Sequence, residues 1–106
     1  NKGDYVFSLE SRDYNNLLEA SKKVAKILEK ALDSPRVAMV FEGTGIAYVH
    51  TKLYPLHGKL ASETNVWSKT QEFYPEYTGY LTTIEGPRMS DKELKDIQTK
   101  IIEAQK

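Results

Sequence analysis

The feature that most constrains the fold of this chain is a long stretch, from about Ser11 to Asp33, in which apolar residues recur every three or four positions. Such spacing places them on one side of an α-helix. The apolar side carries Leu17, Leu18, Ala20, Val24, Ala25, Ile27, Leu28, Ala31 and Leu32, and the opposite side carries Lys22, Lys23, Lys26, Glu29 and Lys30. Ser11 or Asp13 can cap the first turn, and Pro35 disfavours helical backbone in the residue before it. The sequence therefore predicts an amphipathic helix with one face packed on a sheet.

Two candidate strands follow this helix. Residues 36–41 are apolar and rich in β-formers, and residues 46–54 run back after a turn at 42–45 whose two glycines are free to take positive φ. This pattern predicts an antiparallel hairpin. Side chains alternate along a strand, so residues 47, 49, 51 and 53 form a small or apolar side that can lie on the helix. The other side carries Tyr48, His50 and Lys52, and three polar groups in alternation indicate a ligand surface.

The remaining segments complete an α+β pattern in a single domain. Residues 5–9 read as a short strand or an extended entry segment, residues 58–79 as an ordered excursion anchored by aromatic side chains, and residues 80–84 as a strand. Ser90 and Glu93 have the spacing of a capping box, in which each side chain binds the backbone N–H of the other residue. They open a final helix with apolar positions Leu94, Ile97, Ile101 and Ile102.

Composition excludes several classes of protein. The 106 residues are enough for one domain. Fifteen basic residues balance fifteen acidic ones, which argues against a broad surface for a nucleic-acid polymer or an anionic membrane. Cysteine is absent, which excludes disulfides, thiolate zinc sites and cysteine nucleophiles and fits a cytoplasmic protein.

The stretch from Gly43 to His57 resembles the active-site hairpin of the histidine-triad (HIT) nucleotide hydrolases. Members of that family carry three histidines in alternation on a strand, commonly after a glycine-containing turn and often before a proline. Here Tyr48, His50 and Lys52 occupy the three positions, and Pro55 follows them. The resemblance covers residues 2–57, with residues 58–106 as a C-terminal extension. It implies an antiparallel sheet with the long helix packed on one face, a C-terminal helix and a homodimer whose sheets join across the interface.

The resemblance also implies a role for each motif position. His50 is then the nucleophile that attacks the α-phosphate of a nucleotide, and neutral imidazole is well suited to that step near neutral pH. Lys52 stabilises charge on a phosphoryl oxygen or assists the leaving group. Tyr48 hydrogen-bonds phosphate or packs, and the backbone around Gly43, Thr44 and Gly45 approaches the ligand.

Two further positions leave alternatives open at this point. His57 is either a second functional imidazole or an ordinary loop histidine. Neither His57 nor His50 has acidic or cysteine partners at metal-ligand spacing, so no metal and no cofactor is expected. Lys2-Gly3-Asp4 stands where HIT domains carry the segment that follows their first strands. The resemblance thus places those strands before Asn1, and a partner chain can complete the sheet.

The first functional hypothesis is hydrolysis of a dinucleoside polyphosphate or a nucleoside phosphoramidate through a covalent nucleotidyl-histidine at His50. The second is a degenerate HIT domain that binds a nucleotide or a protein partner without turnover. The third is nucleotidyl transfer, because the galactose-1-phosphate uridylyltransferase branch of the superfamily also replaces the third histidine of the motif and remains active.

Overall fold

The computed structural model describes residues 3–66, 75–76 and 88–106. Along the chain these contain a short 3-10 helix (Val6–Ser8), α1 (Ser11–Ala31), β1 (Val37–Glu42), β2 (His50–Pro55), a second 3-10 helix (Gly58–Ala61) and α2 (Asp91–Ala104). β1 and β2 pair antiparallel in a two-stranded sheet. The described part of the chain is therefore α+β, as expected. The predicted strand at residues 80–84 and the aromatic residues between 67 and 74 and at 77 lie outside it.

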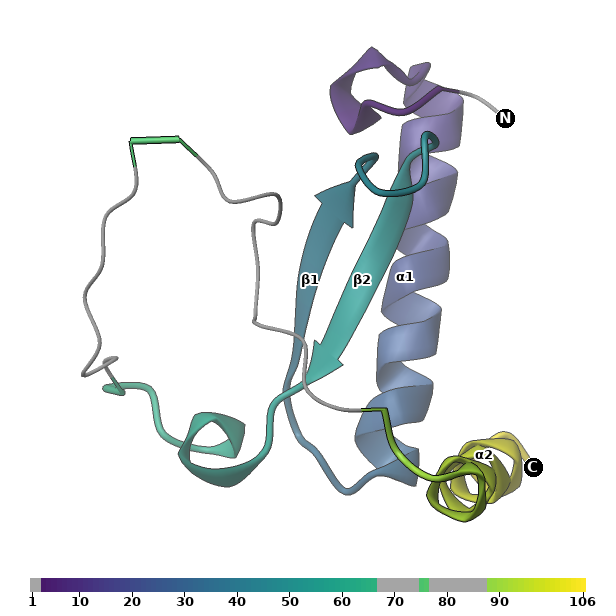
Figure 1. Ribbon diagram of the computed structural model, residues 1–106, viewed down its shortest axis with the longest axis vertical. Coiled ribbons are helices and arrows are strands. Elements are labelled where there is room, and N and C mark those ends of the chain that lie inside the picture. The colour runs from purple at the N-terminus through teal and green to yellow at the C-terminus, as the bar shows by residue number, and fades with distance from the viewer. Residues whose placement is uncertain (1–2, 67–74, 77–87) are drawn as a thin grey trace.

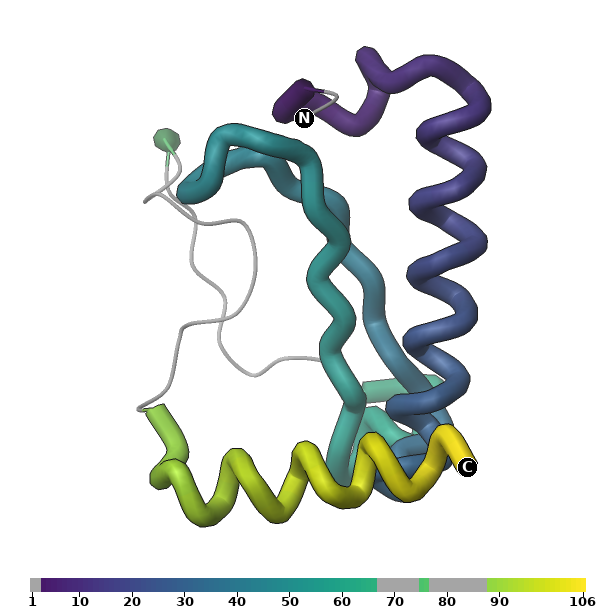
Figure 2. Tube along the Cα trace, turned by 90° about the vertical axis from the view of Figure 1, so that its right-hand side faces the viewer, coloured from purple at the N-terminus to yellow at the C-terminus, as the bar shows by residue number. Residues whose placement is uncertain are grey.

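The helix α1 and the hairpin form two layers (Figures 1 and 2). The side of the sheet that carries Val37, Met39 and Leu53 faces α1, and these residues line a cavity of about 370 Å³ together with Leu18 and Ala25 of the helix. Ser21 Oγ of α1 also lies 3.0 Å from Thr51 Oγ1 of β2, a hydrogen bond between the layers. An isolated two-stranded hairpin is at best marginally stable in water. Its packing on α1 therefore supplies the stability that two strands lack.

The end of α1 shows why the chain turns back onto the sheet. Asp33 has a left-handed φ of 49°, and Ser34 N–H donates to Glu29 O at 3.1 Å, the bond pattern of a Schellman cap. The Ser34 hydroxyl, on a residue that is 1% exposed, then donates to Leu56 O at 2.8 Å. The helix thus ends two residues before the predicted Asp33, and its end is tied to the exit of β2.

At the other end of α1, two local predictions are wrong. Glu10, not Ser11 or Asp13, occupies the N-cap position, and its side chain makes no cap bond. The segment at residues 5–9, predicted as a short strand or an extended entry segment, instead contains the first 3-10 helix, closed by a hydrogen bond from Ser8 N–H to Tyr5 O of 3.0 Å. This turn buries Val6, which is 8% exposed, whereas Tyr5 and Phe7 on either side of it remain exposed.

The hairpin is confirmed, with a longer connection than expected. β2 begins at His50 rather than at residue 46, so the loop comprises residues 43–49. Tyr48 N–H donates to Ile46 O at 2.8 Å, and Val49 N–H donates to Gly3 O at 2.8 Å. Because these backbone groups bond within the loop and to the N-terminal segment, they do not pair with β1.

The final helix, α2, runs across the C-terminal end of α1 rather than along it (Figure 2). The predicted capping box is confirmed: Glu93 N–H donates to Ser90 Oγ at 3.2 Å, and Ser90 N–H donates to Glu93 Oε2 at 3.0 Å. No helix in the described ranges combines the length and the apolarity needed to cross a membrane.

Candidate functional site

The candidate site lies on the face of the hairpin that points away from α1. In the register of the two strands, Glu42 is opposite His50 and Val40 is opposite Lys52. Directly opposed residues share a face of the sheet, and so do residues two apart on one strand. Thr51 and Leu53 face α1. His50, Lys52 and Glu42 therefore share the opposite face, near the end of the hairpin where the loop begins.

The imidazole of His50 is oriented by the main chain. Its Nδ1 lies 3.0 Å from the carbonyl oxygen of Tyr48. A carbonyl oxygen only accepts hydrogen bonds, so Nδ1 must carry the proton in this geometry. The neutral ring then has its lone pair on Nε2. The loop thus orients a half-buried histidine whose Nε2 carries the lone pair when the ring is neutral.

Tyr48 does not lie on the strand, which corrects the predicted row of three side chains. It belongs to the bent loop before β2 and is largely exposed. Its ring still meets the His50 ring edge-on, with the ring centroids 6.3 Å apart and the planes at 70°. The part of Tyr48 that has a defined role at the site is therefore its carbonyl, and its phenol ring packs beside the imidazole.

Lys52 is held by an acidic residue that the sequence pattern did not single out. Its Nζ lies 2.6 Å from Glu42 Oε2. The Glu42 side chain is 4% exposed, and that of Lys52 is 35% exposed. Glu42 could have been identified in part from the sequence. It ends an apolar strand, and an antiparallel register can bring it opposite His50. The ion pair compensates much of the charge that was expected to face a phosphate.

Glu42 is also the more deeply buried member of the pair, so its charge has the higher desolvation cost. Its second oxygen, Oε1, is buried and accepts no hydrogen bond from the described residues. A buried polar atom without a partner costs about 1–3 kcal/mol. The buried carboxylate therefore carries a desolvation cost at this position, with Lys52 as its charge partner.

Gly43, Thr44 and Gly45 lie in the loop at the same end of the hairpin as His50. Of the two glycines expected to be free for positive φ, only Gly45 uses it, with φ of 82°. Gly43 instead allows a close approach, since a Cβ there would collide with the backbone carbonyl of Asp4. The N-terminal segment and the loop border an open cavity of about 350 Å³ lined by Tyr5, Phe7, Phe41 and Thr44, among other residues.

His57 is not brought to this site. It follows β2 at the opposite end from His50 and is exposed. The strand from His50 to Pro55 alone spans roughly 17 Å at ~3.3 Å per residue. His57 is thus too distant to share a ligand phosphate with His50, and the loop-histidine interpretation describes its position.

Within residues 3–66, 75–76 and 88–106, no group of three or more His, Asp or Glu side chains is arranged to hold a metal ion. No protein-family model, curated protein or solved structure matches this chain. The site comprises an oriented imidazole, a neighbouring ammonium held by a buried carboxylate, and a glycine-containing loop beside them.

Proposed function

We propose that this chain is a HIT-like domain that hydrolyses a dinucleoside polyphosphate or a nucleoside phosphoramidate at its α-phosphate, with His50 as the nucleophile. The observation that carries the proposal is the hydrogen bond from His50 Nδ1 to the Tyr48 carbonyl. It leaves the lone pair of a neutral imidazole on Nε2, on the sheet face that α1 does not cover.

The proposed reaction has two steps. In the first, His50 Nε2 attacks the α-phosphorus, a P–N bond forms, and the bond from phosphorus to the leaving phosphate or amine breaks. The leaving group takes a proton from solvent or from a neighbouring acid. In the second step water attacks the same phosphorus, the P–N bond breaks, and the nucleoside monophosphate departs while the imidazole recovers its lone pair. Transfer of the nucleotidyl group to a phosphate acceptor differs only in the nucleophile of the second step.

Lys52 has an electrostatic role in this proposal. It is two residues from His50 on the same face of β2, so the two side chains are about 7 Å apart at their bases. An ammonium at that position stabilises negative charge on a phosphoryl oxygen. Glu42 limits where Nζ can move, since the two groups are in direct contact. A phosphate that binds here must therefore share Lys52 with Glu42 or displace the Glu42 carboxylate from it.

The same ion pair favours the second candidate function, which is nucleotide binding without turnover. A lysine whose charge is compensated by a buried carboxylate is a poor proton donor to a leaving group. In this case the domain holds a nucleotide or a protein partner at the hairpin, and His50 serves as a hydrogen-bonding group.

A homodimer is part of the proposal, since the family resemblance implies one. Within the described residues each strand of the hairpin has a single neighbour, and extension across an interface adds strands to a sheet that has only two. Size-exclusion chromatography with light scattering should give twice the mass of one chain. A monomer across the micromolar range contradicts this part of the proposal.

The experiment that tests catalysis compares three proteins on diadenosine tetraphosphate and adenosine phosphoramidate. Wild type should release adenosine monophosphate, His50→Ala should release none above background, and His57→Ala should match wild type. His57→Ala is a matched control because it removes the other histidine of the chain, which is exposed and at the far end of β2. Mass spectrometry of quenched reactions should find the nucleotidyl group on His50.

The possible outcomes separate the candidates. Nucleotide binding by calorimetry with no turnover in any of the three proteins supports the binding domain and refutes the hydrolase. Turnover that survives in His50→Ala refutes the nucleophile. A labelled His50 that is discharged faster by added phosphate or sugar phosphate than by water indicates transfer.

A further inference from the structure

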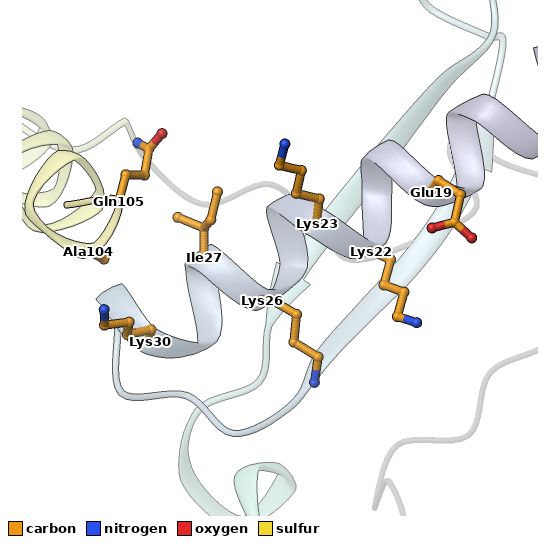
Figure 3. Close-up of a pocket in the computed structure, with 8 residues that line it drawn as sticks. All are labelled: Glu19, Lys22, Lys23, Lys26, Ile27, Lys30, Ala104 and Gln105. Atoms are coloured by element: carbon orange, nitrogen blue, oxygen red, sulfur yellow. The ribbon is translucent and has the colours of Figure 1, made fainter.

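A second surface, remote from the hairpin loop, carries a concentration of positive charge. Four lysines of α1, Lys22, Lys23, Lys26 and Lys30, line an open groove together with Glu19 and Ile27 of the same helix and Ala104 and Gln105 near the end of α2. The groove has a volume of about 640 Å³. Figure 3 shows the lysine side chains projecting from α1, with the end of α2 beside its last turn. We call this surface the lysine groove.

The charge of the lysine groove is largely uncompensated. Lys26 pairs with Glu29 at 3.1 Å, and Lys26 remains 68% exposed in that pair. Lys22, Lys23 and Lys30 form no ion pair with any residue that the structure describes. The whole chain has a formal net charge of zero. The groove is therefore a local excess of positive charge in a neutral chain and attracts a local excess of negative charge.

The spacing of the lysines is regular along the helix. Lys22, Lys26 and Lys30 are separated by four residues each, which is about 6 Å along the axis at ~1.5 Å per residue. Like charges at this spacing repel and weaken a helix. The row thus does not serve the stability of α1. Its regular interval matches acidic side chains that are four residues apart on another helix, because both follow the same helical rise.

The floor of the groove is apolar. Ile27, which is half-buried and projects beside Lys23 in Figure 3, and Ala104 of α2 contribute this apolar surface. Gln105 adds an amide whose Nε2 donates to Ile101 O at 3.2 Å. Among the residues that the structure describes, neither an arginine nor an aromatic side chain lines the groove. Nucleic-acid surfaces rely on bidentate arginines and on rings that stack with bases, so this lining favours a protein ligand.

We propose that the lysine groove binds an acidic amphipathic helix of a partner protein. Glutamate or aspartate side chains at every fourth position of the partner pair with Lys22, Lys26 and Lys30. Apolar side chains on the adjoining positions of the partner cover Ile27 and Ala104. This is the helix-in-groove mode of recognition, with charge giving orientation and the apolar floor adding affinity. It does not depend on chemistry at His50.

The test uses a fluorescein-labelled helical peptide of about 20 residues, the length of roughly five helical turns. The peptide has glutamate at every fourth position and leucine on the adjoining positions. Fluorescence anisotropy measures its affinity for the whole chain at low and moderate salt. A second peptide with glutamine in place of each glutamate tests whether binding depends on the negative charges of the peptide. An oligothymidylate and inorganic polyphosphate, each used as a competitor, test the other polyanions.

The binding variant is Lys22→Gln/Lys26→Gln/Lys30→Gln. It should weaken the glutamate peptide about tenfold, because each of three exposed ion pairs contributes a factor of about two to three. The matched control is Lys92→Gln/Lys95→Gln/Lys100→Gln, which removes the same charge from three exposed lysines of α2 and should change affinity less than about twofold. Ile27→Ser should weaken the peptide with little change in salt dependence. Circular dichroism checks that every variant is folded.

Three results would overturn the proposal. The first is no detectable binding of the glutamate peptide to the wild-type chain at low salt. The second is an equal loss of affinity in the two triple variants, which would mean attraction to overall charge alone. The third is tighter binding of oligothymidylate or polyphosphate than of the peptide, which would assign the groove to that class of polyanion instead.

Discussion

The ion pair between Glu42 and Lys52 allows a quantitative test of how the hairpin face is stabilised. The change is Lys52→Met, which keeps the length of the apolar stem and removes the ammonium. Glu42, with a side chain that is 4% exposed, then has one oxygen that accepts no hydrogen bond from the described residues and a second that has lost its cation. We expect a marked loss of stability from a single substitution on a partly exposed side chain.

The magnitude follows from the burial of the two groups. Removing one member of a fully buried pair costs about 3–5 kcal/mol. Lys52 is 35% exposed, so water can reach part of the space that its ammonium leaves, and the pair is worth less than a fully buried one. We therefore expect Lys52→Met to lower the free energy of unfolding by about 2–3 kcal/mol. Glu42→Gln, which keeps the shape and one acceptor, should cost about 1 kcal/mol.

The double variant Glu42→Gln/Lys52→Met measures the coupling free energy between the two side chains. It no longer buries an unpaired charge, so its loss should be smaller than the sum of the single losses by about 1–2 kcal/mol. Urea denaturation followed by circular dichroism, with the slope compared among the four proteins, provides the measurement. Losses that add within about 0.5 kcal/mol would refute the argument, because they would mean that the pair is not coupled in the folded state.

Three further substitutions test local features of the fold, each by the same urea measurement. Gly43→Ala should destabilise by about 1–3 kcal/mol, because its methyl group would collide with the Asp4 carbonyl and displace the N-terminal segment; hydrogen exchange in that segment should accelerate, whereas Gly45→Ala should leave that exchange unchanged. Ser34→Ala should cost about 1–3 kcal/mol, because it removes the hydroxyl of a residue that is 1% exposed and donates to the chain after β2; a loss below experimental error would contradict this. Asp33→Gly should stabilise by about 1 kcal/mol, because Asp33 holds a left-handed φ of 49°; a destabilised variant would show that its side chain matters more than its backbone.

The main elements of the fold were predictable because their signals are local and repeated. The apolar side of α1 recurs over many residues, and the residues of β1 are continuous β-formers, so both were identified to within about two residues at each end, the usual uncertainty of helix boundaries. The capping box at Ser90 was found for the same reason, since both of its partners lie within four residues. The predicted end of α1 was two residues late, because a left-handed aspartate has no distinctive pattern in the sequence.

The errors lie where distant parts of the chain compete with local preference. Residues 46–49 contain isoleucine, tyrosine and valine and were predicted as strand. In the structure Val49 N–H is taken by Gly3 O, a partner far away along the chain. Residues 5–9 likewise follow a strand-like alternation but form a turn that buries Val6. Tertiary contacts override β-propensity readily, since that propensity depends on context.

The same division applies to the candidate site. Alternation alone placed His50 and Lys52 on the face away from the helix, because that inference needs only one strand. Glu42 required the register between two strands, which a single sequence does not specify here. His57 follows His50 by only seven residues, yet an extended strand separates them by a large distance. For His57, whose segment leaves the hairpin, closeness to His50 in the sequence therefore did not predict closeness in the structure.

A main-chain carbonyl is present whatever side chain a residue carries. Tyr48 orients His50 through its carbonyl oxygen, so the orienting group survives any substitution at this position that keeps the path of the loop. Changes in loop length, by contrast, would move the acceptor even if every side chain were retained. We therefore expect position 48 to tolerate many residue types and the loop to tolerate few insertions or deletions. A tyrosine can stand there without depriving His50 of its orientation.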